Sequence, residues 1–149
     1  MSEESAVRID APPRHLWVVG VLALLWNAMG AFDYLMTQTR NESYMANFTP
    51  EQLEYFYGFP TWVVAFWALA VWGGVLGTIL LLMRKRLAVG VFLGSFVSMV
   101  ITSFHNFVLS NGMETVGGVG PLIFSVVIFF VALGLWIYSR AMAQQGVLS

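Results

Sequence analysis

The length and composition of the chain already exclude several classes of protein. It has 149 residues, of which 58% are hydrophobic and only 10% are charged. A soluble domain carries about 25% charged residues, so this composition predicts an integral membrane protein. The net charge of −1 argues against nucleic acid as a partner, and the lack of cysteine excludes disulfides and thiolate metal sites. The two histidines lie far apart in the sequence and no catalytic or cofactor motif stands out, so we expect no metal, no cofactor and no enzymatic activity.

The first membrane-spanning segment follows a polar tail. We expect residues 1–14, which include two adjacent prolines, to form a loosely ordered cytoplasmic tail. The apolar segment that follows, over about 15–36, has the length of one transmembrane helix, for which about 20 residues suffice. Asn27 and Asp33 interrupt it, and because such groups are costly in hydrocarbon, we expect both to face protein or water.

A second interpretation of this segment stays open. Arg14, the apolar run 16–26 and the small residues that follow have the form of a secretory signal and its cleavage site. Cleavage would leave a chain that begins near Ala31 and has three spans. The long, acidic tail before Arg14 is unusual for a signal, which favours a transmembrane helix.

The polar connection after the first span contains a helix start. Thr49 can cap a helix, Pro50 suits its first position, and Gln52 completes a capping box. Aromatic and apolar residues follow. We therefore expect a short helix over about 50–58 that lies in the headgroup layer with its apolar side toward the bilayer.

Three more apolar segments complete a single membrane domain over residues 1–149. Prolines open the second and fourth spans, and the basic triplet at 84–86 ends the second. These spans are expected over about 61–83, 87–109 and 121–140. The predicted fold class is therefore all-α, a bundle of four transmembrane helices with a short interfacial helix in the first outer loop.

Small and polar residues line one side of the spans and indicate how the helices pack. At about 100° of rotation per residue, the first span gathers Gly20, Ala23, Asn27, Gly30, Ala31 and Tyr34 on one side. The second span gathers Ala70, Gly73, Gly74 and Gly77, and the fourth has a thinner stripe of Ser125, Phe129, Ala132, Trp136 and Ser139. Small residues let backbones approach closely, so we expect these sides to form the helix interfaces.

The third span has two distinct sides. One carries Gly90, Gly94, Ser98, Thr102 and His105, and the other carries Phe92, Phe96, Val100, Phe104 and Phe107. We expect the first side to contact helices and the second to contact lipid. Gly94→Leu should then damage assembly, whereas Phe96→Leu should have little effect.

Polar residues of different spans reach similar depths and suggest one cluster that opens to the outer side. Asp33 lies about 9 Å outward of Asn27 at 1.5 Å per residue, and the position of His105 in the third span gives it a similar depth. The candidate site residues are Asn27, Asp33, His105, Asn106 and Ser125. Because either residue alone would be costly in a dry environment, we expect Asp33 and His105 to lie near each other and to interact.

Structural interpretations of the same residues stay open. Asp33 could lie in interfacial water near Arg40, and His105 could be a packing residue. Asn27 could form an interhelical hydrogen bond, an interaction that contributes about 0.6 kcal/mol on average in membranes.

Several stretches of the sequence resemble a family of small bacterial inner-membrane proteins, some of which carry the label "sugar transporter". The resemblance is carried by Trp26-Asn27-x-x-Gly30-Ala31-Phe32-Asp33-Tyr34-x-Met36-Thr37, Phe48-Thr49-Pro50-Glu51-Gln52, Tyr55-Phe56-Tyr57-x-Phe59-Pro60, Trp72-Gly73-Gly74-Val75-Leu76-Gly77 and Asn106-Phe107. It covers most of the chain. The resemblance implies four spans and a bacterial inner membrane, and it supplies no catalytic residues.

These features favour a small inner-membrane protein of transporter type, in contact with the lipid bilayer. Four helices alone enclose little space, so we expect an oligomer, with Asn27, Asp33 and His105 contacting the substrate or a proton. The alternative is a non-catalytic accessory or assembly subunit of a larger membrane complex, in which the polar groups hold helices together.

The distribution of basic residues yields a prediction about orientation. Cytoplasmic connections carry an excess of Lys and Arg, and a cytoplasmic triplet at 84–86 places both termini and every basic residue except Arg40 on that side. Reporter fusions after residue 149 and within 110–120 should therefore report opposite sides of the membrane. A mature N-terminus near Ala31 would contradict the four-span interpretation.

Overall fold

The computed structural model describes residues 12–109 and 119–149, with the side chains of 119–122 left out. Every regular element of these residues is helical: α1 (Arg14–Gln38), α2 (Glu42–Met45), α3 (Pro50–Tyr57), α4 (Thr61–Leu82), α5 (Leu87–Phe104), the π-helix η1 (His105–Leu109) that continues α5, and α6 (Val119–Gln144). Four helices, namely α1, α4, α5 with η1, and α6, are long and apolar enough to cross a membrane. The predicted all-α bundle of four spans is confirmed. Most of the expected N-terminal tail and the loop before α6 lie outside the described residues.

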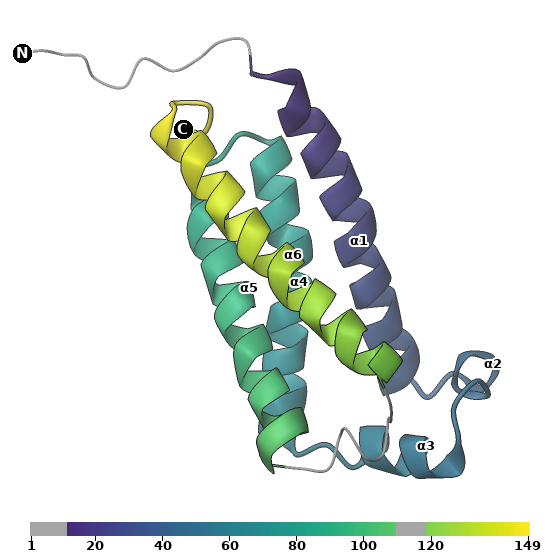
Figure 1. Ribbon diagram of the computed structural model, residues 1–149. Coiled ribbons are helices and arrows are strands. Elements are labelled where there is room, and N and C mark those ends of the chain that lie inside the picture. The colour runs from purple at the N-terminus through teal and green to yellow at the C-terminus, as the bar shows by residue number, and fades with distance from the viewer. Residues whose placement is uncertain (1–11, 110–118) are drawn as a thin grey trace, which may run out of the picture.

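The long helices are arranged around α4 and α5. Figure 1 shows α1, α4 and α5 running along one another, while α6 crosses them diagonally. α4 packs against both α1 and α5, α6 packs mainly against α5, and α1 and α6 meet only sparsely within the described residues. The start of α1, the α4–α5 turn and the end of α6 share one end of the bundle, and α2 and α3 lie at the other.

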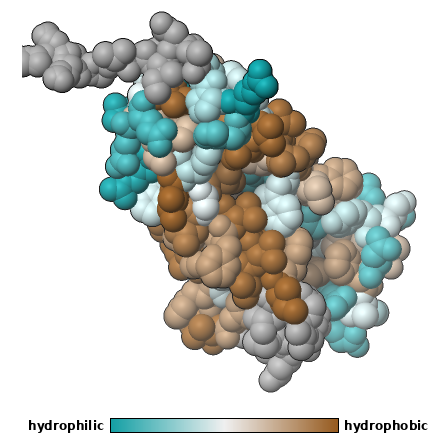
Figure 2. All heavy atoms as spheres, turned by 45° about the horizontal axis from the view of Figure 1, so that its top comes forward, coloured by the Kyte–Doolittle hydropathy of each residue, from teal (hydrophilic) through white to brown (hydrophobic). Residues whose placement is uncertain are grey.

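The outer surface of the bundle is apolar, as contact with a lipid bilayer requires. Hydrophobic side chains cover much of the face in Figure 2, and hydrophilic ones gather toward its margins. Large apolar side chains stay exposed on the long helices, including Leu22 at 61% and Phe130 at 62%. These side chains would meet water in a soluble protein, so the surface identifies a multi-pass membrane protein.

Glycines of α1 and α4 create the close helix contacts that the sequence predicts. A Cβ added to Gly74 would lie 2.2 Å from Oδ1 of Asn27, so the amide of α1 fills the space that this glycine leaves on α4. About one turn further along α4, a Cβ on Gly77 would lie 2.8 Å from the ring of Phe92 in α5. The predicted interfaces of the first and second spans are therefore confirmed.

The predicted sides of the third span are only partly correct. Ser98 and His105 are buried and Phe104 is exposed, as predicted, but both glycines and Phe92 were assigned to the wrong side. Gly90 and Gly94 are exposed, and a Cβ added to either would meet nothing within 4 Å. Phe92, expected to face lipid, is buried against Gly77, and the hydroxyl of Ser95 donates to the carbonyl of Ala70 at 2.5 Å. The glycines are thus on α4 and the bulky partner is on α5, because one of two closely packed helices must supply side chains to fill the space left by the other.

The end of the bundle opposite the start of α1 and the end of α6 is covered by the two short helices. The predicted capping box at α3 is confirmed, since the side chain of Thr49 accepts from the backbone of Gln52 and that of Gln52 accepts from the backbone of Thr49. The sequence reading missed α2, whose N-cap is Asn41, with its side chain accepting from the backbone of Tyr44. Together α2 and α3 position aromatic side chains over the ends of the spans.

The C-terminal residues attach the end of α6 to the α4–α5 turn. Val147 and Leu148 are buried in the core, and the backbones of Ser149 and the turn exchange two hydrogen bonds, with Arg86 and Arg84, at 2.9 and 3.0 Å. The side chain of Arg84 also donates to the carbonyl of Val147 at 3.0 Å. α6 is therefore held firmly at this end.

One glycine on each of two adjacent helices gives a matched prediction about packing. Gly74→Ala would push the new methyl group into the amide of Asn27 and should lower stability by about 1–3 kcal/mol. Gly94→Ala should be neutral or slightly stabilising, because the new methyl group meets nothing and alanine favours helix. Thermal unfolding of both variants in the same detergent measures the difference, and equal melting temperatures would contradict the assigned interface.

Candidate functional site

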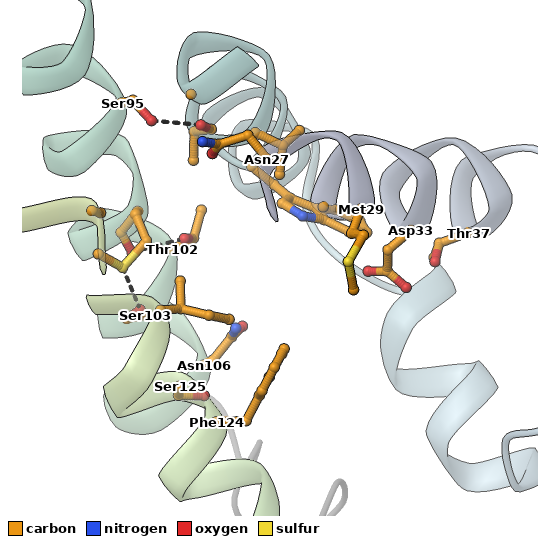
Figure 3. A pocket seen from close by; sticks show the side chains of 18 of the residues that line it. Asn27, Met29, Asp33, Thr37, Ser95, Thr102, Ser103, Asn106, Phe124 and Ser125 are labelled. Atoms are coloured by element: carbon orange, nitrogen blue, oxygen red, sulfur yellow. Dashed lines mark hydrogen bonds between the residues drawn. The ribbon is translucent and has the colours of Figure 1, made fainter. Parts of the chain in front are cut away.

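A cavity of about 610 Å³ lies between the four long helices and is covered by α2 and α3. Figure 3 shows side chains of α1, α5 and α6 directed toward it from different sides. Most of its lining is apolar or aromatic, and its polar members are Asn27, Asp33, Thr37, Tyr44, Tyr55, Ser95, Thr102, Ser103, Asn106 and Ser125. A volume of this size, with few polar groups in an apolar wall, is typical of a small-molecule site.

The structure places four of the five predicted site residues around this cavity. Asn27, Asp33, Asn106 and Ser125 all contribute to its lining, from α1, η1 and α6. His105 is not among the lining residues that the structure describes. These four residues therefore border one cavity, and their role in binding stays a prediction.

Asn27 joins α1 to α4 inside the bundle. Its side-chain nitrogen donates to the carbonyl of Ala23 at 2.9 Å and to the hydroxyl of Thr78 at 3.2 Å. The hydroxyl of Thr78 in turn donates to the carbonyl of Gly74 at 2.7 Å. The interhelical hydrogen bond that the sequence suggests for Asn27 is therefore present, and this residue has a structural function as well as a place in the cavity wall.

Asp33 interacts with α2 and not with His105. The hydroxyl of Tyr44 donates a hydrogen bond to Oδ1 of Asp33. Tyr44 is therefore the partner of Asp33, in place of the predicted partner, His105. Arg40, the other suggested partner, has its guanidinium over the ring of Tyr57, 4.3 Å from the ring centroid. The expected pairing of Asp33 with His105 is wrong because α2 folds back over the end of α1 and supplies a nearer donor.

The environment of Tyr44 keeps its phenol protonated. Burial, the hydrogen bond to Asp33 and the negative charge of Asp33 together raise the pKa of Tyr44 from 10.0 to about 12. Each of these causes disfavours the phenolate, burial most of all. Tyr44 therefore remains a neutral hydrogen-bond donor to the carboxylate throughout the physiological pH range.

His105 packs in an aromatic setting at the start of η1. Its buried ring lies edge-on to Phe59 and Trp62, with centroid distances of 5.8 and 5.5 Å. Its Nδ1 is 3.1 Å from Oδ1 of Asn106, and the hydroxyl of Tyr55 donates to the same oxygen at 3.3 Å. The geometry agrees with the interpretation of His105 as a packing residue that helps to orient Asn106.

Sequence reasoning missed the aromatic part of the site. Tyr44 and Tyr55 reach the cavity from α2 and α3, and Trp26 and Phe124 contact each other across it from α1 and α6, with centroids 5.9 Å apart. The N-cap signal at Asn41 could have revealed α2. Nothing in the sequence alone brings Phe124 to Trp26, because that contact depends on the crossing angle of α6.

The described residues offer no group of three His, Cys, Asp or Glu that could hold a metal ion. Comparison with known proteins adds no assignment: no protein-family model, curated protein or solved structure matches this chain. The family resemblance drawn from the residues therefore stays a prediction.

The raised pKa of Tyr44 predicts a shift that ultraviolet spectroscopy of phenolate formation can measure. The Tyr44→Phe variant should lack one tyrosine that titrates near pH 12 in the wild type. The difference between the two titration curves therefore identifies the titration of Tyr44. In Asp33→Asn that titration should move toward 10 without reaching it, because the largest cause, burial, remains. Stability from this interaction is fully present below pH 10 and falls as pH rises through the folded pKa. An unchanged titration in Asp33→Asn would contradict the contact.

Proposed function

We propose that this protein is a small membrane protein of transporter type that binds its substrate in the cavity between the four long helices. The observation that supports this proposal is the cavity of about 610 Å³ with polar groups from several helices directed into it. Binding sites for small molecules are usually concave, mostly apolar and furnished with few polar groups. The proposal places the protein in a bacterial inner membrane with both termini cytoplasmic, so that α2 and α3 cover the outer side.

Bare glycines on the outer surface support association with other helices. Gly90 and Gly94 on α5 and Gly134 on α6 have nothing near the position of a Cβ, so a neighbouring helix could approach the backbone closely at these positions. Such a helix could belong to a second copy of the chain, as in an oligomeric transporter, or to another subunit. The second candidate function is therefore a non-catalytic accessory or assembly subunit of a larger membrane complex.

A cavity-filling substitution tests the proposed function. Ala132 lines the cavity, and Ala132→Phe should occupy part of it and reduce the amount of any bound molecule at least tenfold. Ala65→Phe is the matched control, because Ala65 is exposed on α4 and is not among the lining residues. The three proteins would be extracted from their own membrane in mild detergent, and retained small molecules and proteins identified by mass spectrometry.

The outcomes separate the two candidate functions. A small molecule retained by the wild type and by Ala65→Phe, but lost from Ala132→Phe, supports binding in the cavity. A protein partner retained in fixed ratio by all three proteins, with no small molecule above an empty-detergent control, would instead identify an accessory subunit.

A further inference from the structure

One residue carries the charge among the described residues that line the cavity. Asp33 is the only Asp, Glu, Lys or Arg among these lining residues. Within the described part of the chain, Tyr44 is the one hydrogen-bond donor to this carboxylate, and it contacts Oδ1. Because that donor is a neutral phenol, the contact supplies a hydrogen bond but no positive charge. The negative charge of Asp33 is thus left without a counter-charge from the lining.

The nearest candidate for a counter-charge in the sequence is directed elsewhere. Arg40 follows α1, but its guanidinium lies over the ring of Tyr57, 4.3 Å from the centroid, and neither residue belongs to the cavity lining. A guanidinium over an aromatic face is itself a favourable cation–π arrangement. The structure therefore gives Arg40 a partner of its own and leaves Asp33 facing the cavity (Figure 3).

Aromatic side chains surround the same space. The lining includes Trp26, Trp67, Phe48, Phe56, Phe59 and Phe124. The face of an aromatic ring attracts cations, and this attraction contributes about 2 kcal/mol or more when the cation is desolvated. One carboxylate and several rings in the lining of the same largely apolar cavity therefore favour a ligand that carries one positive charge.

The same lining disfavours an inorganic cation. Ca²⁺ takes six to eight oxygen ligands, and Mg²⁺ requires near-octahedral oxygen coordination. The described residues provide no group of three His, Cys, Asp or Glu for a metal ion. Asp33 is the one carboxylate among the described lining residues, and the other side-chain oxygens of the lining belong to neutral amides, hydroxyls and phenols. The lining also includes Val71, Ile128 and Leu135, which suit a hydrophobic body.

We propose that the cavity binds a monovalent organic cation with an apolar or aromatic body, and that Asp33 provides the counter-charge for its ammonium-type group. Tyr44 holds the carboxylate in position through its hydrogen bond, and the rings contact the ligand from the sides. This inference rests on the proposed function, since it names the class of ligand for the same cavity.

A pair of probes that differ in charge tests the inference on the full chain. Benzyltriethylammonium and para-tert-butylbenzenesulfonate are both small aromatic ions with branched or ethyl groups, and their charges are opposite. Binding would be measured by equilibrium dialysis against the protein in phosphatidylcholine nanodiscs, with empty nanodiscs as the reference. We expect saturable binding of the cation, and no binding of the anion above the empty nanodiscs.

Substitution of the carboxylate locates the charge. Asp33→Asn should weaken binding of the cation at least tenfold, because the amide still accepts from Tyr44 but has no charge. Glu54→Gln, the same change on the exposed side of α3 away from the cavity lining, should leave binding unchanged. The comparison of the two probes on the wild type remains decisive even if Asp33→Asn fails to fold.

Several results would overturn the inference. Equal binding of both probes, or undiminished cation binding by Asp33→Asn, would show that the cavity accepts apolar bodies regardless of charge, and the proposed function would stand. Absence of saturable cation binding would also overturn the inference. The proposed function would then be judged separately by the loss of co-purified molecules from Ala132→Phe, which does not use these probes.

Discussion

The contact between Asn27 and Gly74 is the constraint on which the arrangement of the helices depends. An amide inside a membrane span must find hydrogen-bond partners within the protein, because lipid offers none. Asn27 reaches Thr78 only because Gly74 has no side chain, and a Cβ there would lie 2.2 Å from the amide oxygen. This contact holds α1 against α4, and by doing so it fixes the side of α1 on which Asp33 faces the cavity.

Close packing on one side of the bundle and a divergent helix on the other explain why a cavity exists. α4 packs tightly against α1 and α5, where glycines meet an amide and a phenyl ring. α6 is attached to the α4–α5 turn by Val147 and Leu148, but it crosses away from α5 toward the end of α1 (Figure 1). Met29 and Phe124 line the cavity and are 66% and 56% exposed, so the space reaches the bundle surface between α1 and α6. An apolar molecule could therefore enter from the bilayer.

Local signals in the sequence predicted the elements better than their partners. The four spans, the capping box at Thr49 and the small-residue sides of α1 and α4 follow from length and residue type. The burial of Phe92 in α5 did not follow, because only the glycine at position 77 of α4 decides that this ring faces inward. The partner of Asp33 was missed for a related reason, since it depends on how α2 folds back and not on the depth of residues in the spans.

The hydrogen bond between Tyr44 and Asp33 does not by itself explain why this position carries a charge. An asparagine oxygen could accept from the same phenol, and an amide is less costly than a carboxylate near hydrocarbon. After burial, the hydrogen bond to Asp33 and the negative charge of Asp33 also raise the pKa of Tyr44. The fold therefore requires an acceptor at Asp33 but not a negative charge. A charge that the fold does not require, directed into an aromatic cavity, is the feature on which the proposed cationic ligand depends.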